Sequence, residues 1–108
     1  MDFSPDRQPD VATAARVAEP SYQPMRLRAE TRQGITRWFR ADICAMSTEG
    51  CLLSPIEPID AGQPLRLRLP GLQPLTARVC AENDGKVECR FAVPLHIAVF
   101  EHLARMAH

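Results

Sequence analysis

The residues best placed for chemistry are a serine and a glycine inside an apolar stretch that runs from Ile43 to Leu53. Ser47 carries a hydroxyl that donates or accepts hydrogen bonds, and Gly50 suits a sharp turn because only glycine takes a positive φ at little cost. Apolar residues on both sides predict two strands joined by a short polar corner. Both residue types are also common in tight turns, so a purely structural connection explains them as well as a ligand site does.

The spacing of this corner resembles the core motif of PilZ domains. That motif has an aliphatic residue, an acidic or amide residue, a serine, a glycine and an apolar pair. Ile43, Ser47, Gly50 and Leu52-Leu53 stand at the matching positions, whereas the acidic position holds Ala45. The resemblance implies a mainly β fold, a small antiparallel β-barrel of about six strands with a C-terminal α-helix. It also implies a non-enzymatic signalling module of the bacterial cyclic di-GMP system.

In PilZ domains this motif and a separate Arg-x-x-x-Arg pair bind cyclic di-GMP. By resemblance, Arg16 would meet a phosphate or stack on guanine, Ser47 would donate to the ligand, and Gly50 would let the backbone approach it. The residue four positions before Arg16 is Ala12, and Ala45 offers no acceptor to a guanine edge. A buried donor left unpaired costs about 1–3 kcal/mol. We therefore expect a degenerate site at which nucleotide binding is weak or lost.

Other function classes have their own sequence signals. A ligand-independent adaptor that binds a partner protein is the alternative to a nucleotide receptor. No nucleophile–base pair, carboxylate pair or metal spacing stands out, and His96 and His102 fall on different helix faces, so we expect neither an enzyme nor a metal cofactor. A generic nucleic-acid-binding barrel would rest on Trp38 and nearby arginines. With 13 basic and 13 acidic residues the chain is formally neutral, and we expect no nucleic-acid partner.

Length and composition set the organisation of the chain. A sequence of 108 residues, 45% of them hydrophobic, holds one domain with one core. Residues 1–24 are rich in proline and polar residues and predict a flexible tail, which leaves 25–108 for the barrel and helix. The four cysteines lack C-x-x-C spacing, the N-terminus lacks a signal-peptide pattern, and no apolar run reaches the roughly 18 residues of a membrane span. These features predict a cytoplasmic protein that has reduced thiols and no membrane contact.

The first strand candidate, residues 25–32, alternates apolar and polar residues. Arg28 and Arg32 form a literal Arg-x-x-x-Arg, but the alternation places both on the solvent face of the strand. With a hairpin loop over residues 32–34, Leu27 would face Phe39 inside the barrel. The same register would set Trp38 against Arg28 outside, a cation–π pair worth about 0.5–1 kcal/mol. Further arginines could extend a basic stripe on this hairpin: Arg26, Arg37 and Arg40.

Two registers compete for the last hairpin. A two-residue turn at Asp84-Gly85 would set Cys80 opposite Cys89 but would place three apolar positions opposite charged ones. A three-residue loop over 83–85 removes these mismatches, points Cys80 outward and Cys89 inward, and argues against a disulfide. We therefore expect the three-residue loop. It pairs Ala81 with Val87, Val79 with Cys89 and Ala77 with Phe91.

The remaining elements complete the barrel. Three prolines between residues 54 and 64 exclude a central strand there, and 65–69 and 75–81 are strand candidates. From Pro94 onward the pattern is helical, with one apolar stripe that should cap the barrel. The stripe consists of Leu95, Val99, Leu103 and Met106.

Overall fold

Apolar residues at every second position form the strands, as the sequence predicts. The structure, a computed structural model, describes residues 22–107. Seven strands and one helix follow each other: β2 (Gln23–Leu27), β3 (Glu30–Arg32), β4 (Phe39–Met46), β5 (Gly50–Pro55), β6 (Leu65–Arg68), β7 (Leu75–Asn83), β8 (Lys86–Phe91) and α2 (Ile97–Met106).

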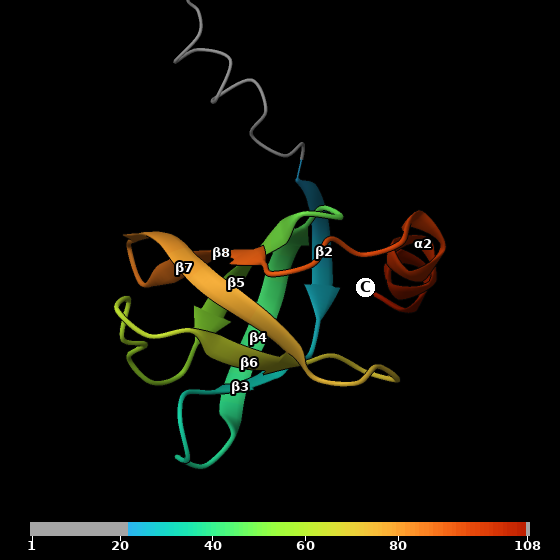
Figure 1. Cartoon of the computed structure of the whole chain (residues 1–108). Helices are drawn as coiled ribbons and strands as arrows, with labels where there is room; N and C mark the ends of the chain where they lie inside the picture. Colours follow the sequence, from blue (N-terminus) through green and yellow to red (C-terminus); the bar gives the residue numbers. More distant parts are fainter. Residues whose placement is uncertain (1–21, 108) are drawn as a thin grey trace, which may run out of the picture.

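Six of these strands close into an antiparallel barrel in the order β3, β6, β7, β8, β5, β4 and back to β3. β2 is an extra strand that pairs with β4 beside β3, and α2 lies next to β2 at one side of the barrel (Figure 1). The predicted mainly β fold, a small barrel with a C-terminal helix, is confirmed.

The core lies inside the barrel and extends under the helix. The inward residues of the first strand candidate are buried as predicted, and so is Leu103 of α2. Val99 packs partly against the core, whereas Met106 is 40% exposed, so the predicted apolar stripe ends before it. Among the described residues no helix has the length and apolar character that a membrane crossing requires. Residues 1–21, most of the predicted tail, lie outside the described range.

The predicted register of the first hairpin is wrong. Leu27 pairs with Ile43, and Phe39 pairs with Thr31, so the loop spans 33–38 rather than 32–34. The amide side chain of Gln33 explains the wider loop. It donates to the carbonyl oxygens of residues 60 and 63 and accepts from the backbone N–H of residue 60, which ties the loop to the one after β5.

The last hairpin also departs from its predicted register. Asp84 and Gly85 form a two-residue turn with φ of 54° and 79°, as a type I′ turn requires, and Ala81 pairs with Glu88. A β-bulge at Cys80 then shifts the pairing by one residue, so that Val79 does meet Cys89. On the side of the bulge away from the turn, apolar residues of β7 and β8 therefore lie opposite each other again. Cys80 is exposed and Cys89 buried, as predicted.

Gly50 begins β5 for a reason that the sequence did not indicate. Its φ is not positive, so left-handed backbone is not what the site requires. A Cβ at this position would overlap the carbonyl oxygen of Cys89 and would lie 3.1 Å from the Cα of Arg90. Glycine therefore lets β5 approach β8 closely at the point where the barrel closes.

Replacing Gly50 tests this contact. Gly50→Ala should lower the free energy of unfolding by about 1–3 kcal/mol, the usual range for overpacking, because the new methyl group meets backbone that has no room to move. Gly62→Ala is the matched control, since its Cβ would meet only the flexible carboxylate of Asp60. Urea unfolding of both variants measures the difference. Equal stability of the two variants would show that β5 and β8 are not packed this closely.

Candidate functional site

The corner between β4 and β5 is held by the hydroxyl of Ser47. Its Oγ accepts hydrogen bonds from the backbone N–H groups of Glu49 at 3.0 Å and Gly50 at 3.3 Å. The backbone N–H of Ser47 donates to the carbonyl oxygen of Gly50 at 2.9 Å, which closes the turn. Only 8% of Ser47 is exposed. The serine therefore stabilises the turn in the way that serine side chains commonly do.

The same corner is bonded to the chain segment that leads from β8 to the helix. The carbonyl oxygen of Glu49 accepts from the N–H of Phe91, and that of Thr48 accepts from the N–H of Leu95, both at 2.8 Å. Polar backbone groups of the corner are thus used to join three parts of the fold: β4, β5 and the approach to α2.

The structure brings two of the three predicted site residues together. Ser47 and Gly50 share the corner, and each has a structural task there. Arg16 and Ala12 lie outside the described residues. Ala45 follows a β-bulge at Cys44 and is half-buried beside its partner Leu52 on the outer side of the barrel. The nucleotide-binding roles of Ser47 and Gly50 remain predictions.

A groove of about 800 Å³ lies on the outer face of the strands that flank this corner. It is lined from β2, β4, β5 and β8, and Cys44, three residues before Ser47, forms part of its wall. A volume of this size falls within the range of small-molecule sites. Its lining includes four basic side chains: Arg26, Arg28, Arg40 and Lys86.

Basic side chains outnumber carboxylates in this groove. Arg40 is bound to Asp42 through two nitrogens, at 3.0 and 2.8 Å, and this hydrogen bonding lowers the pKa of the Asp42 carboxyl. Arg26, Arg28 and Lys86 form no ion pair with another described residue. Three exposed cations therefore face a groove whose single carboxylate is already paired, which suits an anionic ligand.

The arginines predicted to form one basic stripe on the first hairpin do not lie together. Arg28 lines the groove, but Arg32 does not. Instead Arg32 and Arg68 lie against Trp38, with guanidinium carbons 5.1 and 3.9 Å from the ring centroid, so the predicted pairing of Trp38 with Arg28 is wrong. Sequence reasoning also missed Lys86. It reaches the groove because β8 pairs with β5, and that long-range pairing has no local sequence signal.

The cysteines are free thiols. Cys51 and Cys89 pair across β5 and β8 and are buried. Burial raises the pKa of the Cys89 thiol to about 12 and raises that of Cys51 as well, so both are unreactive near neutral pH. Within residues 22–107 no three His, Cys, Asp or Glu side chains come together as a metal-binding group.

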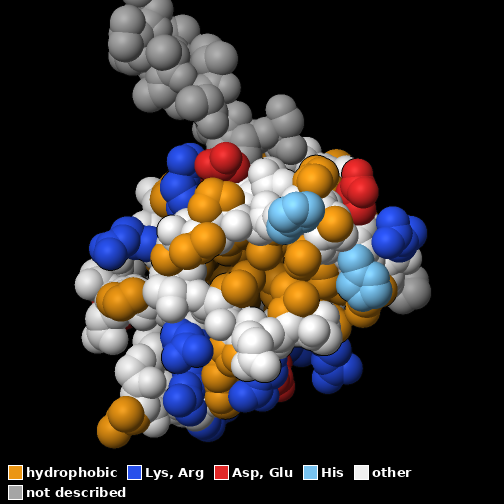
Figure 2. Space-filling view, turned by 45° about the vertical axis from the view of Figure 1, so that its right-hand side comes forward, with side chains coloured by type: hydrophobic (Ala, Val, Ile, Leu, Met, Phe, Trp, Pro, Cys, Tyr) orange, Lys and Arg blue, Asp and Glu red, His pale blue; other side chains and the backbone are white. Residues whose placement is uncertain are grey.

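A second surface lies around α2. Figure 2 shows apolar side chains gathered at the centre of this face, with basic side chains near its edge. Large apolar residues exposed in this part of the chain are Val93, Ile97 and Met106. Patches of this kind on soluble domains often mark contact with another protein.

The structural role of Ser47 can be separated from any role in binding. Ser47→Ala should lower the free energy of unfolding by about 1 kcal/mol, because two backbone N–H groups lose their acceptor. Ser54→Ala, at an exposed position on the next strand, is the control and should have no effect beyond about 0.5 kcal/mol. Thermal or urea unfolding measures both. A Ser47→Ala variant as stable as the control would mean that the corner does not depend on the hydroxyl.

Comparison of the chain with protein-family models finds no match, and comparison with curated proteins finds no significantly similar sequence. The resemblance of the corner residues to the PilZ motif therefore stays a prediction from the sequence.

Proposed function

We propose that this chain is a PilZ-type signalling module of the cyclic di-GMP system, non-enzymatic, with a degenerate nucleotide site. The observation that carries the proposal is the basic groove on the outer face of β4 and β5, the strands that lead into and out of the corner. Arg40 and Cys44 line it from β4, and Cys44 directly precedes Ala45, the position where the motif of the family has its acidic residue.

The chemistry of the groove suits a cyclic dinucleotide. Both phosphodiester groups of cyclic di-GMP are anionic, and arginine binds phosphate oxygens through paired N–H donors. Arg26 and Arg28 are exposed and have no described carboxylate partner that a ligand would have to displace. Ala45 supplies no acceptor for a guanine edge, so affinity would come from the phosphates and would fall with salt.

The alternative is a ligand-independent adaptor that binds a partner protein. Its supporting observation is the apolar surface around α2, with Val93, Ile97 and Met106 exposed. In that case the groove would be an ordinary solvated basic surface, and the output of the protein would depend on contacts made by the helix.

Isothermal titration of the full chain with cyclic di-GMP at moderate salt tests the proposal. We expect binding in the micromolar range, weakened about tenfold or more in Arg28→Ala or Lys86→Ala, since a charge-assisted hydrogen bond contributes about 1.5–3 kcal/mol. Arg105→Ala removes an exposed arginine on α2, away from the groove, and should bind as the parent does.

Two further results complete this test. Restoring the side chains that the PilZ motif has, Ala45→Asp with Ala12→Arg, should tighten binding. If neither the parent nor this double variant gave binding heat, the result would contradict the proposed cyclic di-GMP site and favour the ligand-independent adaptor.

A further inference from the structure

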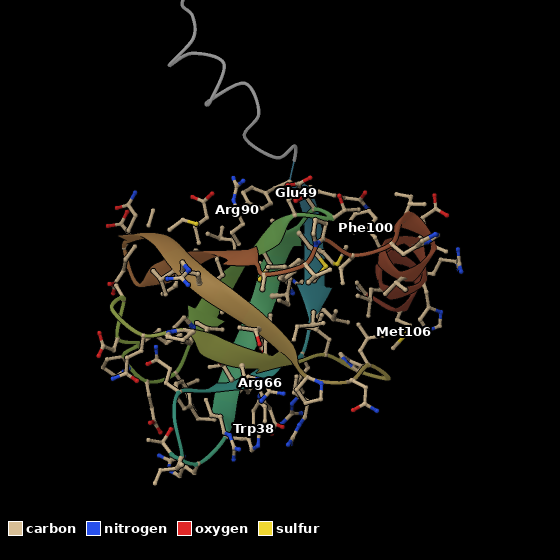
Figure 3. All side chains as sticks on the ribbon, in the orientation of Figure 1. Trp38, Glu49, Arg66, Arg90, Phe100 and Met106 are labelled. Carbon is tan, nitrogen blue, oxygen red and sulfur yellow. The ribbon has the colours of Figure 1, made fainter. Side chains whose placement is uncertain are left out.

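Five arginines follow one another around the outer surface of the barrel, and none of them lines the groove. We call them the arginine stripe. Four are exposed and Arg32 is half-buried. In Figure 3, Trp38 and Arg66 lie at the lower end of the molecule and Arg90 lies at the upper end. The stripe crosses β3, β6, β7 and β8 and consists of Arg32, Arg66, Arg68, Arg78 and Arg90.

The register of the strands places like charges directly opposite each other. Arg32 pairs with Arg66 across β3 and β6, and Arg78 pairs with Arg90 across β7 and β8. Cross-strand pairs of like charge destabilise a sheet, so two of them on one surface are a cost that the fold alone does not explain. An anion bound along the stripe would relieve that repulsion.

Few carboxylates oppose this charge. Glu30 pairs with Arg68, with nitrogen and oxygen 3.0 Å apart. Glu88 lies on the same strand as Arg90, but its carboxylate accepts a hydrogen bond from the hydroxyl of Tyr22 at 2.9 Å. Glu49 lies near the upper end and forms no ion pair with another described residue. The stripe is thus locally cationic in a chain whose total formal charge is zero.

Trp38 orders one end of the stripe. The guanidinium carbon of Arg68 lies 3.9 Å from its ring centroid, and that of Arg32 lies 5.1 Å away. The Nε of Arg32 is buried and has no hydrogen-bond partner. Guanidinium groups that are held against an aromatic ring lose less freedom when they bind phosphate, which favours binding there.

A hollow of about 220 Å³ lies at the other end. Arg78 and Arg90 both line it, and apolar groups of Pro64, Ala77 and Phe91 complete the wall. Proteins stack unpaired bases on aromatic rings or on arginine guanidinium planes, and Arg78 and Arg90 provide such planes at this hollow.

The surface chemistry favours a nucleic acid over a protein partner. The cores of protein interfaces combine arginine with large apolar and aromatic side chains in well-packed, desolvated patches. Among the described residues the large exposed apolar side chains lie outside the stripe, in loops or around α2: Ile35, Ile56, Val93, Ile97 and Met106.

We infer that the arginine stripe binds single-stranded nucleic acid, with phosphates along the guanidinium groups and a base in the hollow beside Arg78. Bases without a pairing partner stack on arginine planes, and arginine recognises phosphate through its paired donors. The site is separate from the groove proposed for cyclic di-GMP and uses none of its residues. Formal neutrality of the chain therefore does not exclude a nucleic-acid partner, because the charge is concentrated locally.

Trp38 provides the readout, since it is the single tryptophan of the chain and contacts the stripe. Titration with short oligothymidylate and oligouridylate should change its fluorescence, with micromolar affinity at low salt. About four phosphate contacts give a salt slope near −3, so affinity should fall about 50-fold between about 50 and 200 mM salt. Anisotropy of a labelled oligonucleotide measures the same binding independently.

Variants distinguish this site from the groove. Arg66→Ala with Arg78→Ala should weaken oligonucleotide binding at least tenfold while the thermal unfolding temperature stays equal or rises, because each like-charge pair is relieved. Arg26→Ala, in the groove, should leave oligonucleotide binding unchanged. Absence of binding at low salt, or binding that survives the double variant, would overturn the inference. The inference would also be overturned if polyglutamate bound as tightly as the oligonucleotide and lost its affinity in the double variant. That result would favour an acidic protein segment as the ligand.

Discussion

The close approach of β5 to β8 at Gly50 is the constraint on which the rest of the structure depends. A side chain there would overlap the carbonyl oxygen of Cys89, so the barrel closes only because this residue has none. Closure aligns Cys51 with Cys89 and brings the start of β8 beside β5. The hydroxyl of Ser47 holds the turn that delivers Gly50 to this position. Packing and local hydrogen bonding thus account for both residues without a ligand.

Because the corner is occupied by structural bonds, we propose that any ligand binds on the outer surface of the strands. Closure puts Lys86 in the same groove as Arg26 and Arg28, although Lys86 follows them by 60 and 58 positions in the chain. On the other side, pairing of β3 with β6 and of β7 with β8 aligns the arginine stripe. One barrel therefore presents two cationic surfaces, and we propose a compact nucleotide for the groove and an extended strand for the stripe.

Sequence patterns predicted the barrel and most of its inward residues, because alternation at period two is a local property that strands retain. The failures involve features set by partners distant in the chain. In the last hairpin, a bulge at Cys80 rather than a three-residue turn brings the apolar residues of the two strands opposite each other. In the first hairpin, Gln33 widens the loop because its side chain bonds to another loop. Lys86 in the groove and Trp38 beside Arg68 follow from strand pairing, which no single segment encodes.

We propose that the groove on the outer face of β4 and β5 is the nucleotide site. The most direct measurement is an NMR titration of the isotopically labelled full chain with cyclic di-GMP, following backbone and arginine side-chain N–H signals. We expect shifts concentrated at Arg26, Arg28 and Lys86, with the signals of Arg66 and Arg78 unchanged. No shifts at saturating nucleotide, or shifts confined to residues outside the groove, would contradict it.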